Sequence, residues 1–398
     1  MAGTHGGNPS DGAGSAPLEG LVVADFSRVL AGPLCSMFLA DLGATVIKVE
    51  RPGAGDDTRA WGPPYVGSSS TYFSSVNRNK LSVTLDLTEP ADQELAKALA
   101  RRADVFVENF LPGKLASFGL DSASVLAANP AVVYASISGF GSGAGADLPG
   151  YDFVVQAVGG LMSITGDAGG APTKVGVALV DVLTGLHATI AILAALRARE
   201  LSGEGQHVEV NLLSSLLGSL VNQGAAYLNG GGVPAAMGNR HPSIAPYETL
   251  AAADGPLAVA AGNDRQFKAM AEALERPDLA TDSRFASNRD RVANREALVH
   301  ELESAMKSRG AHQWMNAFKA RGIPCGPVND IADAINFAQE LGLSPVVTLP
   351  SPGGDIATLA SPLVLHRTPV RYRNAPPDLG ADSDRVRSWL AGENGPLL

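Results

Sequence analysis

Hydrophobic positions in the first half of the chain form short apolar runs, separated by longer segments that mix apolar and polar residues. Short apolar runs bounded by turn residues are typical of buried strands. The run 21–26 precedes a helical segment that Gly32 and Pro33 open and Gly43 ends. Further strands are predicted at 44–50, 82–87, 104–110 and 131–140, and a second helix at 89–103.

The order strand, helix, strand within about thirty residues indicates parallel strands joined by crossover helices. We therefore predict an α/β fold with a doubly wound, Rossmann-like large domain. Loops at the strand ends of such a sheet are available for a nucleotide-like ligand. No GxGxxG pattern follows the first strand, so a dinucleotide-dependent dehydrogenase is disfavoured.

A long apolar segment, 175–201, predicts a buried helix that contains one unexpected residue. Asp181 stands between Val180 and Val182, with a helix expected to begin beside it and to run to about Leu201. Asp is a favoured N-cap residue, so the local sequence by itself favours a capping role. A strand passing into a helix is predicted next, over 207–220.

The pattern changes in the second half. Residues 228–246 and 322–330 have the composition of loops, and 247–262 predicts two strands joined by an Asp254–Gly255 turn. Helices are expected up to about Arg321, and scattered strands precede a short helix at 382–392. The predicted organisation is a disordered tail (1–17), the large domain (18–212), a linker (213–235), a smaller α+β domain (236–330) and a linker with a C-terminal return to the large domain (331–398).

Composition narrows the possible functions. The 398 residues are 45% hydrophobic and 18% charged, with a net charge of −10 that argues against nucleic acid as a partner. Cys35 and Cys325 supply neither a disulfide framework nor metal-ligand spacing. With no signal peptide and no apolar run of about 18 residues, we expect a cytoplasmic protein that binds no membrane and no metal.

Nine segments of the chain stand out as motifs. They are DFSRVLAGP (25–33), DLGATVIKVERPGAGD (41–56), NRNKLSVTLDL (77–87), ADVFVENFLPG (103–113), YASISGFG (134–141), GYDFVVQAVGG (150–160), VALVDVLTG (177–185), GQHVEV (205–210) and GIPCGPV (322–328). In this order and spacing they resemble the class III CoA-transferases, the family of formyl-CoA transferase and carnitine CoA-transferase. The resemblance implies an enzyme that uses coenzyme A as a substrate, with no permanently bound cofactor, and whose partners are an acyl-CoA and a carboxylic acid. It also implies an interlocked-ring homodimer.

Within this resemblance Asp181 matches the family nucleophile. Its carboxylate would attack the acyl-CoA thioester, release CoA thiolate and form a mixed anhydride. The thiolate would then place CoA on the aspartyl group, from which the acceptor carboxylate takes it over. An anhydride keeps the transfer potential of the thioester, and apolar neighbours would protect it from water.

The resemblance also implies contacts to CoA. Arg51 would contact the nucleotide portion, although a solvated arginine at a strand end is an equal alternative. Asn109 could instead be a turn residue and Phe110 a core residue, and for Phe110 the core role is the strong alternative. Some members have Arg where this chain has Ser117 and Lys where it has Ser138, which leaves the phosphate contacts open. The implied CoA-binding residues are Leu30, Ala31, Arg51, Leu85, Asn109, Phe110, Ser138 and Gly139.

The segment 238–248 matches the loop that closes over the aspartyl intermediates. Asn239, Arg240 and His241 are the candidates for contacting the acceptor acid, with Tyr151 as a further substrate-binding candidate. The alternative is a surface loop with incidental polar residues. The sequence is most similar to members that use succinyl-CoA and dicarboxylic acids.

Two other functions remain open. An α-methylacyl-CoA racemase would share the fold, but it has a His–Asp pair where this chain has Tyr151 and Asp152, and a late acidic residue matching Asp264. Tyrosine, with an ordinary pKa of about 10, is a poor base for two-base proton transfer. A non-catalytic acyl-CoA-binding protein would have no need of Asp181.

Overall fold

A computed structural model describes residues 15–67, 69–392 and 397. The chain divides into two compact units. The first comprises the residues up to Gly159, Gly176–Ala225 and the residues from Gly342 onward, and the second comprises Gly160–Val175 and Ala226–Leu341. Each unit is described by itself below.

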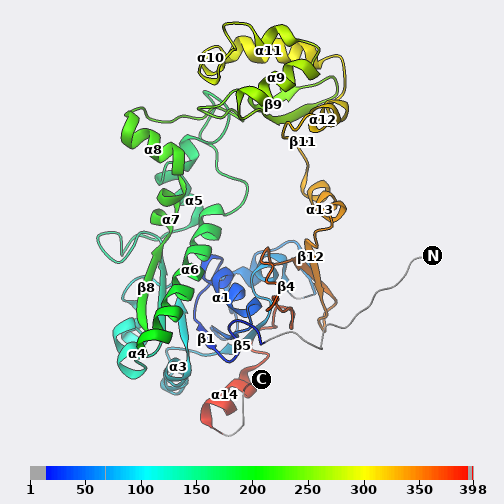
Figure 1. Cartoon of the computed structure of the whole chain (residues 1–398). Helices are drawn as coiled ribbons and strands as arrows, with labels where there is room; N and C mark the ends of the chain where they lie inside the picture. Colours follow the sequence, from blue (N-terminus) through cyan, green and yellow to red (C-terminus); the bar gives the residue numbers. More distant parts are fainter. Residues whose placement is uncertain (1–14, 68, 393–396, 398) are drawn as a thin grey trace, which may run out of the picture. The chain divides into compact units, whose positions relative to one another are not determined.

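A six-stranded parallel sheet forms the centre of the first unit, in the order β5-β2-β1-β6-β7-β8 (Figure 1). Numbered along the chain, these strands run 3-2-1-4-5-6, which is the doubly wound order. The predicted α/β fold with a central parallel sheet is therefore confirmed. The strands are β1 (Val22–Asp25), β2 (Thr45–Glu50), β5 (Lys80–Thr84), β6 (Val105–Glu108), β7 (Val133–Ser138) and β8 (Gln206–Asn211).

Helices cover both faces of this sheet. Helices α3 (Pro90–Arg102), α4 (Ser122–Ala128) and α14 (Ser383–Ala391) pack with the sheet in one core that includes Ala24, Ile47 and Phe106. Because side chains alternate along a strand, the intervening residues point to the opposite face. Helices α1 (Ala31–Asp41) and α6 (Leu179–Ser202) pack side by side in the same unit (Figure 1).

The predicted linker segment 213–235 is helical up to Gly230 apart from a break at Leu220, and its first helix agrees with the helix predicted at the end of 207–220. Asn211 caps α7 by accepting a hydrogen bond from the Ser214 amide at 2.8 Å, so a helix follows β8 directly. The remaining elements outside the small sheet are α2 (Thr71–Ser75), α5 (Asp152–Val158), α7 (Leu212–Ser219), α8 (Val221–Gly230), β3 (Tyr65–Val66), β4 (Ser69–Ser70), β12 (Val346–Leu349), β13 (Ile356–Leu359) and the short 3-10 turns at Asp57–Ala60, Lys114–Phe118 and Leu161–Ser163.

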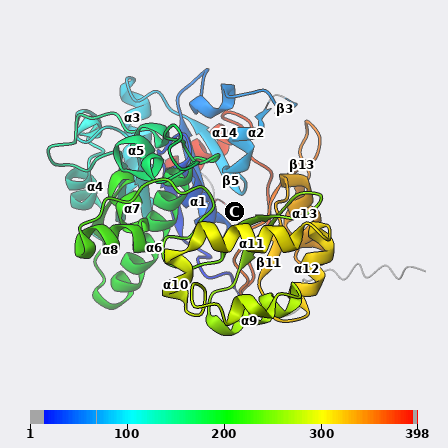
Figure 2. The same ribbon diagram turned by 90° about the horizontal axis from the view of Figure 1, so that it is seen from above.

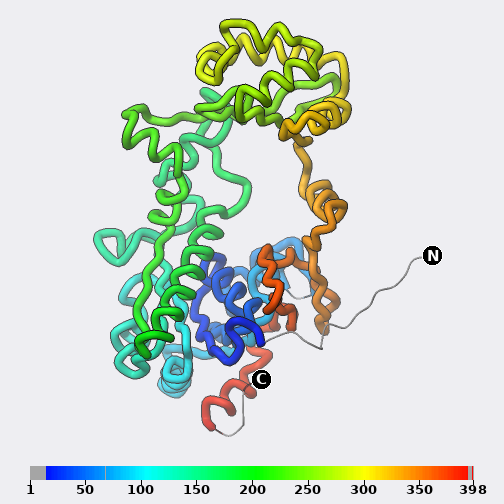
Figure 3. The backbone as a smooth tube through the Cα atoms, in the orientation of Figure 1, coloured from blue at the N-terminus to red at the C-terminus, as the bar shows by residue number. Residues whose placement is uncertain are grey.

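The two ends of the chain differ from the expectation in detail. Residues 1–14 of the predicted tail lie outside the described residues, whereas Ala16 is buried beside Gly43. The C-terminal segment from Gly342 onward belongs to the first unit, where its red helix lies beside the blue and cyan elements (Figure 3). Asp382 accepts a hydrogen bond from the Ser82 amide at 3.0 Å, and Arg102 donates to the Trp389 carbonyl.

The second unit contains a three-stranded antiparallel sheet, β11-β10-β9, with helices gathered around it (Figure 2). The predicted hairpin at Asp254–Gly255 is confirmed by the pairing of β9 (Tyr247–Ala251) with β10 (Pro256–Ala260). The prediction of a loop at 322–330 is wrong for β11 (Cys325–Pro327), since a three-residue edge strand is too short to show alternation. The helices are α9 (Asp264–Ala273), α10 (Asn288–Ala293), α11 (Arg295–Met306), α12 (Ala311–Lys319) and α13 (Ile331–Glu340), with a 3-10 turn at Pro277–Ala280.

Helix α6 has 24 residues and is long and apolar enough to cross a membrane by length and composition. Its buried positions include Val180, Ala188 and Ile192, and it packs against α1, α7 and β8. The apolar character of α6 thus supplies core contacts within the first unit.

Candidate active site

A crevice opens where the doubly wound sheet changes direction, at the carboxyl ends of β1 and β6. This is the position at which such sheets bind ligands. A cavity of about 240 Å³ lies there, lined by the segments that follow β1, β6 and β7 and by the start of α6. It brings together eight of the residues predicted for the site: Leu30, Ala31, Asn109, Phe110, Ser138, Gly139, Tyr151 and Asp181.

Asp181 is not the N-cap of its helix, contrary to the reading from the local sequence. Helix α6 begins at Leu179 after Ala178, so Asp181 lies in the first turn. The capping carboxylate belongs to Asp152, which accepts hydrogen bonds from the amides of Val180 at 2.8 Å and Asp181 at 3.3 Å. A residue 28 positions earlier therefore caps the helix, and the Asp181 carboxylate is left available for another role.

Close packing of α6 against α1 directs Asp181 toward the crevice. A Cβ at Gly185 would lie 2.7 Å from the Ala31 carbonyl oxygen, so only glycine allows this approach. Residues four apart share one face of a helix, which places Asp181 on the same side as Gly185. The carboxylate thus faces the beginning of α1, where Leu30 and Ala31 also line the cavity.

The environment of Asp181 disfavours the charged carboxylate. Burial, and then the negative charge of Asp152, raise the pKa of Asp181 from 3.8 to about 7. Across the described ranges 15–67, 69–392 and 397, no hydrogen bond or ion pair involves its carboxylate oxygens. A carboxylate that is poorly solvated and unpaired is a candidate nucleophile.

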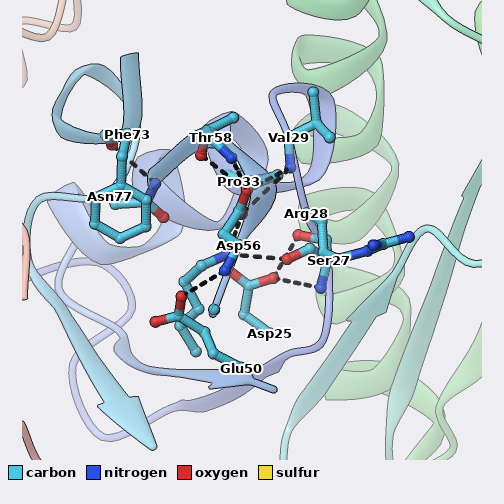
Figure 4. Close-up of polar contacts among 12 residues, drawn as sticks. Asp25, Ser27, Arg28, Val29, Pro33, Glu50, Asp56, Thr58, Phe73 and Asn77 are labelled. Atoms are coloured by element: carbon cyan, nitrogen blue, oxygen red, sulfur yellow. Dashed lines mark hydrogen bonds and ion pairs between the residues drawn. The ribbon is translucent and has the colours of Figure 1, made fainter. Parts of the chain in front are cut away.

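A buried polar network holds the segment between β1 and α1. Val29 has a φ of +71°, a left-handed conformation that a β-branched residue adopts only when its surroundings impose it. Asp56 accepts a hydrogen bond from the Val29 amide at 3.2 Å (Figure 4). Lys48 Nζ donates hydrogen bonds to Asp56 and to the Ser27 carbonyl, both at 2.9 Å. The Lys48 and Asp56 side chains are completely buried.

Asp25 anchors the same segment from the end of β1. Its carboxylate accepts hydrogen bonds from the Ser27 amide at 3.0 Å, from the Ser36 hydroxyl at 2.5 Å and from Lys80 Nζ at 3.1 Å. Burial alone would raise the pKa of Asp25, but Lys80, Lys48 and the hydroxyls lower it to about 2. The segment that walls the crevice is therefore fixed by charges that stay ionised near neutral pH.

The segments after β6 and β7 complete the wall. The Asn109 amide clamps the Arg28 backbone, accepting from its N–H at 2.8 Å and donating to its carbonyl at 2.7 Å. Gly139 and Gly150 cross so closely that a Cβ on Gly139 would lie 2.6 Å from the Gly150 Cα. This crossing delivers Tyr151, which is 57% exposed, to the cavity lining.

A second cavity of about 690 Å³ adjoins the first within the same unit. It contains Arg51 and Leu85, the two predicted CoA contacts that do not line the first cavity. Arg28, Phe110 and Leu111 line both cavities, so one extended ligand could occupy them together. Half-buried Phe110 is therefore a cavity wall as well as a neighbour of the core.

Asn239, Arg240 and His241 lie in the second unit, before β9, whereas Asp181 lies in the first. Asn239 Nδ2 donates to Thr249 Oγ1 at 3.1 Å, and the Ser243 amide donates to His241 Nδ1 at 3.1 Å. The Arg240 guanidinium pairs with Glu296 at 2.5 Å and with Glu248 at 3.4 Å.

Sequence reasoning missed Arg28, Lys48, Asp56 and Asp57. One signal was present, because Lys48 interrupts the apolar run of β2 and a lysine inside a buried strand requires an anionic partner. No local pattern identifies Asp56 as that partner. Asp56 lies in the loop after β2, and only the folded path of this loop places its carboxylate beside Lys48. In the part of the chain that the structure describes, no group of three or more His, Cys, Asp or Glu could hold a metal ion.

Known proteins share much of this sequence and its fold. Residues 18–383 match the model of CoA-transferase family III. The chain belongs to this family. A succinate–glutarate CoA-transferase of Agrobacterium fabrum is 41% identical over 382 residues, covering 94% of this chain and 96% of the relative. An acetyl-CoA:oxalate CoA-transferase of Acetobacter aceti is 43% identical over 325 residues, covering 81% and 83%.

The fold is also shared with a solved structure. A CAIB/BAIF family protein from Brucella suis is 41% identical, with a TM-score of 0.84, covering 95% of this chain and 100% of that protein. The predicted resemblance and the predicted enzyme class, a CoA-transferase, are thus confirmed.

Proposed function

We propose that this family III CoA-transferase moves CoA from succinyl-CoA to a second dicarboxylate through covalent intermediates on Asp181. The observation that carries the assignment is the unpaired Asp181 carboxylate in the switch-point crevice, with its pKa raised to about 7. The substrates are proposed from the relatives, of which one is named for succinate and glutarate and another for acetyl-CoA and oxalate.

The reaction begins when an Asp181 carboxylate oxygen attacks the thioester carbonyl. The C–S bond breaks, CoA leaves as the thiolate, and a mixed anhydride remains on the enzyme. The thiolate then attacks the aspartyl carbonyl, which releases the donor acid as a carboxylate and leaves CoA as a thioester on Asp181. The acceptor carboxylate then attacks the aspartyl thioester, which releases CoA thiolate and forms a second mixed anhydride. The thiolate attacks the acceptor's acyl carbonyl, so the new acyl-CoA leaves and the Asp181 carboxylate is restored.

The first unit suits this chemistry. Partial burial weakens hydration of the Asp181 carboxylate and so increases its reactivity, and it limits hydrolysis of an anhydride. We place the thioester end of the donor beside Asp181 and the nucleotide end in the second cavity, near Arg51 and Leu85. Exposed Tyr151 would border the acyl group, and Asn239, Arg240 or His241 would contact the acceptor.

We further propose that the enzyme is a cytoplasmic homodimer in which two ring-like chains interlock, with neither membrane nor nucleic acid as a partner. Interlocked chains cannot separate without unfolding. The dimer is therefore expected to persist at nanomolar concentration in mass photometry. A stable, active monomer under these conditions would contradict the interlocked assembly.

Trapping of the aspartyl intermediate tests the mechanism. After incubation with succinyl-CoA, hydroxylamine should convert Asp181 into a hydroxamate that peptide mass spectrometry locates, and the Asp181→Asn variant should show no modification. Exchange of the α-proton of a 2-methylacyl-CoA with deuterated solvent serves as the test for racemisation. Exchange at the rate of turnover, without hydroxamate at Asp181, would identify a racemase instead.

A further inference from the structure

The first turn of α6 uses its backbone N–H groups in an unusual way. The N–H groups of the first turn of a helix have no partner within the helix, and they commonly stabilise a nearby anion. In α6 the Val177 carbonyl accepts from the Leu179 amide at 2.8 Å. The Asp152 carboxylate accepts from the amides of Val180 and Asp181 at 2.8 and 3.3 Å. These three amides are therefore used and cannot stabilise the negative charge of the Asp181 side chain.

Asp152 is a buried carboxylate that neutral groups hold in place. Besides the two amides of α6, the Gln156 side chain donates from Nε2 to Asp152 Oδ2 at 2.6 Å, and Gln156 is itself completely buried. Within residues 15–67, 69–392 and 397, no ion pair includes Asp152. The start of a helix carries the equivalent of about half a positive charge, whereas Asp152 adds a full negative one. The net charge at the start of α6 is therefore negative.

Other titratable side chains around Asp181 are neutral or already paired. Tyr72 of α2 packs on the same apolar cluster as Val182. Burial, and then the charge of Asp181, raise the pKa of Tyr72 to about 12, so its hydroxyl is neutral. Arg28 and Asp57 line the cavity together with Asp181 and pair with each other at 3.1 Å, and exposed Tyr151 lines it as well.

The elements packed against α6 add no further charge beside Asp181 in the described part of the chain. Helix α7 has no titratable residue, and the acidic residue of α1, Asp41, is paired with Arg78 at 2.6 Å. On β7 and β8, Tyr134 belongs to the core of the opposite sheet face, and His207 is its direct partner in the strand register. Glu209, two residues after His207, points to that same face. After burial, the charge of Asp152 is the cause that raises the pKa of Asp181.

We propose that Asp152 is a positioning residue that keeps the Asp181 carboxylate reactive, by occupying the amides at the start of α6 and by placing a second negative charge beside the nucleophile. The proposal rests on the proposed function, because it assumes that Asp181 attacks the thioester. An Asp181 carboxylate stabilised by free amides would be a weaker base and a weaker nucleophile.

The direction of charge movement in the reaction gives Asp152 its effect on the rate. Before the attack, the carboxylates of Asp152 and Asp181 repel each other. When Asp181 forms the anhydride, its negative charge passes to the departing CoA thiolate, and the repulsion is relieved. An interaction that is unfavourable in the ground state and weaker in the transition state lowers the barrier.

The Asp152→Asn variant separates the charge of Asp152 from its capping role, because an asparagine oxygen accepts the same amide hydrogen bonds. The measurement is kcat/KM for succinyl-CoA as a function of pH. In the wild type the acidic limb should have its midpoint near the pKa of Asp181, about 7. In the variant it should move on the order of one pH unit lower, because a like charge has been removed. The plateau at high pH should fall by up to about tenfold, since the carboxylate is less basic.

Asp152→Ser provides a second neutral capping residue and should show the same shift, which keeps the test available if the Asn variant does not fold. Asp121→Asn is the matched control, because Asp121 caps α4 of the same unit through the Ser124 amide at 3.1 Å and lines neither cavity. It should leave the midpoint unchanged.

The position of the midpoint decides between a tuning role and a purely structural one. A residue that only capped α6 would change the plateau and leave the midpoint at its wild-type pH. An unmoved midpoint in the neutral variants, with the Asp181 hydroxamate still formed, would therefore overturn the role of Asp152. Absence of the hydroxamate in the wild type would instead refute the proposed function.

Discussion

Two arginine-bearing segments, one in each unit, differ in how their charges are compensated. In the first unit, Arg28 and Arg51 share the single carboxylate of Asp57. In the second, Arg240 pairs with Glu296 and Glu248, and Glu248 also pairs with Arg295 at 3.0 Å. The first cluster has a surplus positive charge, whereas the second is balanced with two arginines and two carboxylates.

The difference shows that an arginine in a loop is not by itself an anion site. Hydrogen bonding to Glu296 raises the pKa of Arg240, which means that the guanidinium is already stabilised by its protein neighbours. An incoming carboxylate at Arg240 must compete with two that are present. At Arg28 it must displace only one carboxylate, which a second arginine also holds.

The largest expected effect is the loss of kcat when Asp181, in the first unit, is substituted. Asp181→Ala should lower kcat for CoA transfer about 10⁴-fold or more, because it removes the nucleophile. Asp181→Asn keeps the shape of the side chain and should lose as much activity. Stopped assays by liquid chromatography measure both variants, and turnover by either at the wild-type rate would contradict the assignment.

The next prediction compares the buried and exposed ion pairs. Lys48→Met leaves the buried Asp56 carboxylate without its cation and should lower the free energy of unfolding by about 3–5 kcal/mol. Arg240→Met breaks more exposed pairs and should cost about 1 kcal/mol or less. Urea unfolding followed by circular dichroism measures both free energies of unfolding. Equal losses would contradict the expected difference between the buried and the more exposed ion pairs.

A third experiment tests the acceptor site in the second unit. If the acceptor is a dicarboxylate held there, either Arg240→Ala or His241→Ala should raise its KM about ten- to hundred-fold, the loss of one charge-assisted contact. Only one of the two should do so, since adjacent residues of an extended segment point apart. A monocarboxylate of equal length is the control substrate; equal changes for both acids would remove the support for a dicarboxylate.

The pH dependence of kcat/KM should depend on Asp181 in the first unit and not on Arg240 in the second. Asp181 must be ionised to attack, so kcat/KM for the acyl-CoA should fall about tenfold per pH unit below its pKa of about 7. The same limb should appear in the Arg240→Ala variant, because Arg240 lies in the other unit and stays charged throughout. A profile that stays flat down to about pH 5 would show that the pKa of Asp181 is not raised in the free enzyme.

The smallest expected effect is on stability. The pKa of Asp181 is about 7 in the folded protein against 3.8 as its ordinary value, so folding favours the protonated form. That contribution to stability is fully present below pH 3.8 and is lost as the pH rises through 7. Asp181→Asn should therefore match the wild type in acid and exceed it by about 1–2 kcal/mol at alkaline pH, solvent screening reducing the full effect. Thermal unfolding across pH measures this, and a wild type more stable than the variant in alkali would reverse the sign.

The sequence by itself determined the α/β class and most of the first sheet. Alternating apolar runs and helical segments are local signals, and the strands predicted from 21–26 and 44–50 correspond to β1 and β2. The motif around VALVDVLTG was also sufficient to single out Asp181, because a lone carboxylate in an apolar segment is visible without any structure.

Only the tertiary structure decided which groups act on these residues. Asp152 caps α6 although it lies 28 positions before Val180 in the sequence. Asp56, in the loop after β2, accepts hydrogen bonds from Lys48 and from the Val29 amide. Gly185 is required because the Ala31 carbonyl of helix α1 approaches it closely, and nothing within helix α6 itself requires a glycine there. Contacts of this kind depend on how separate elements pack. The hydrophobic periodicity of the sequence cannot predict them, because it shows only which face of each element is buried.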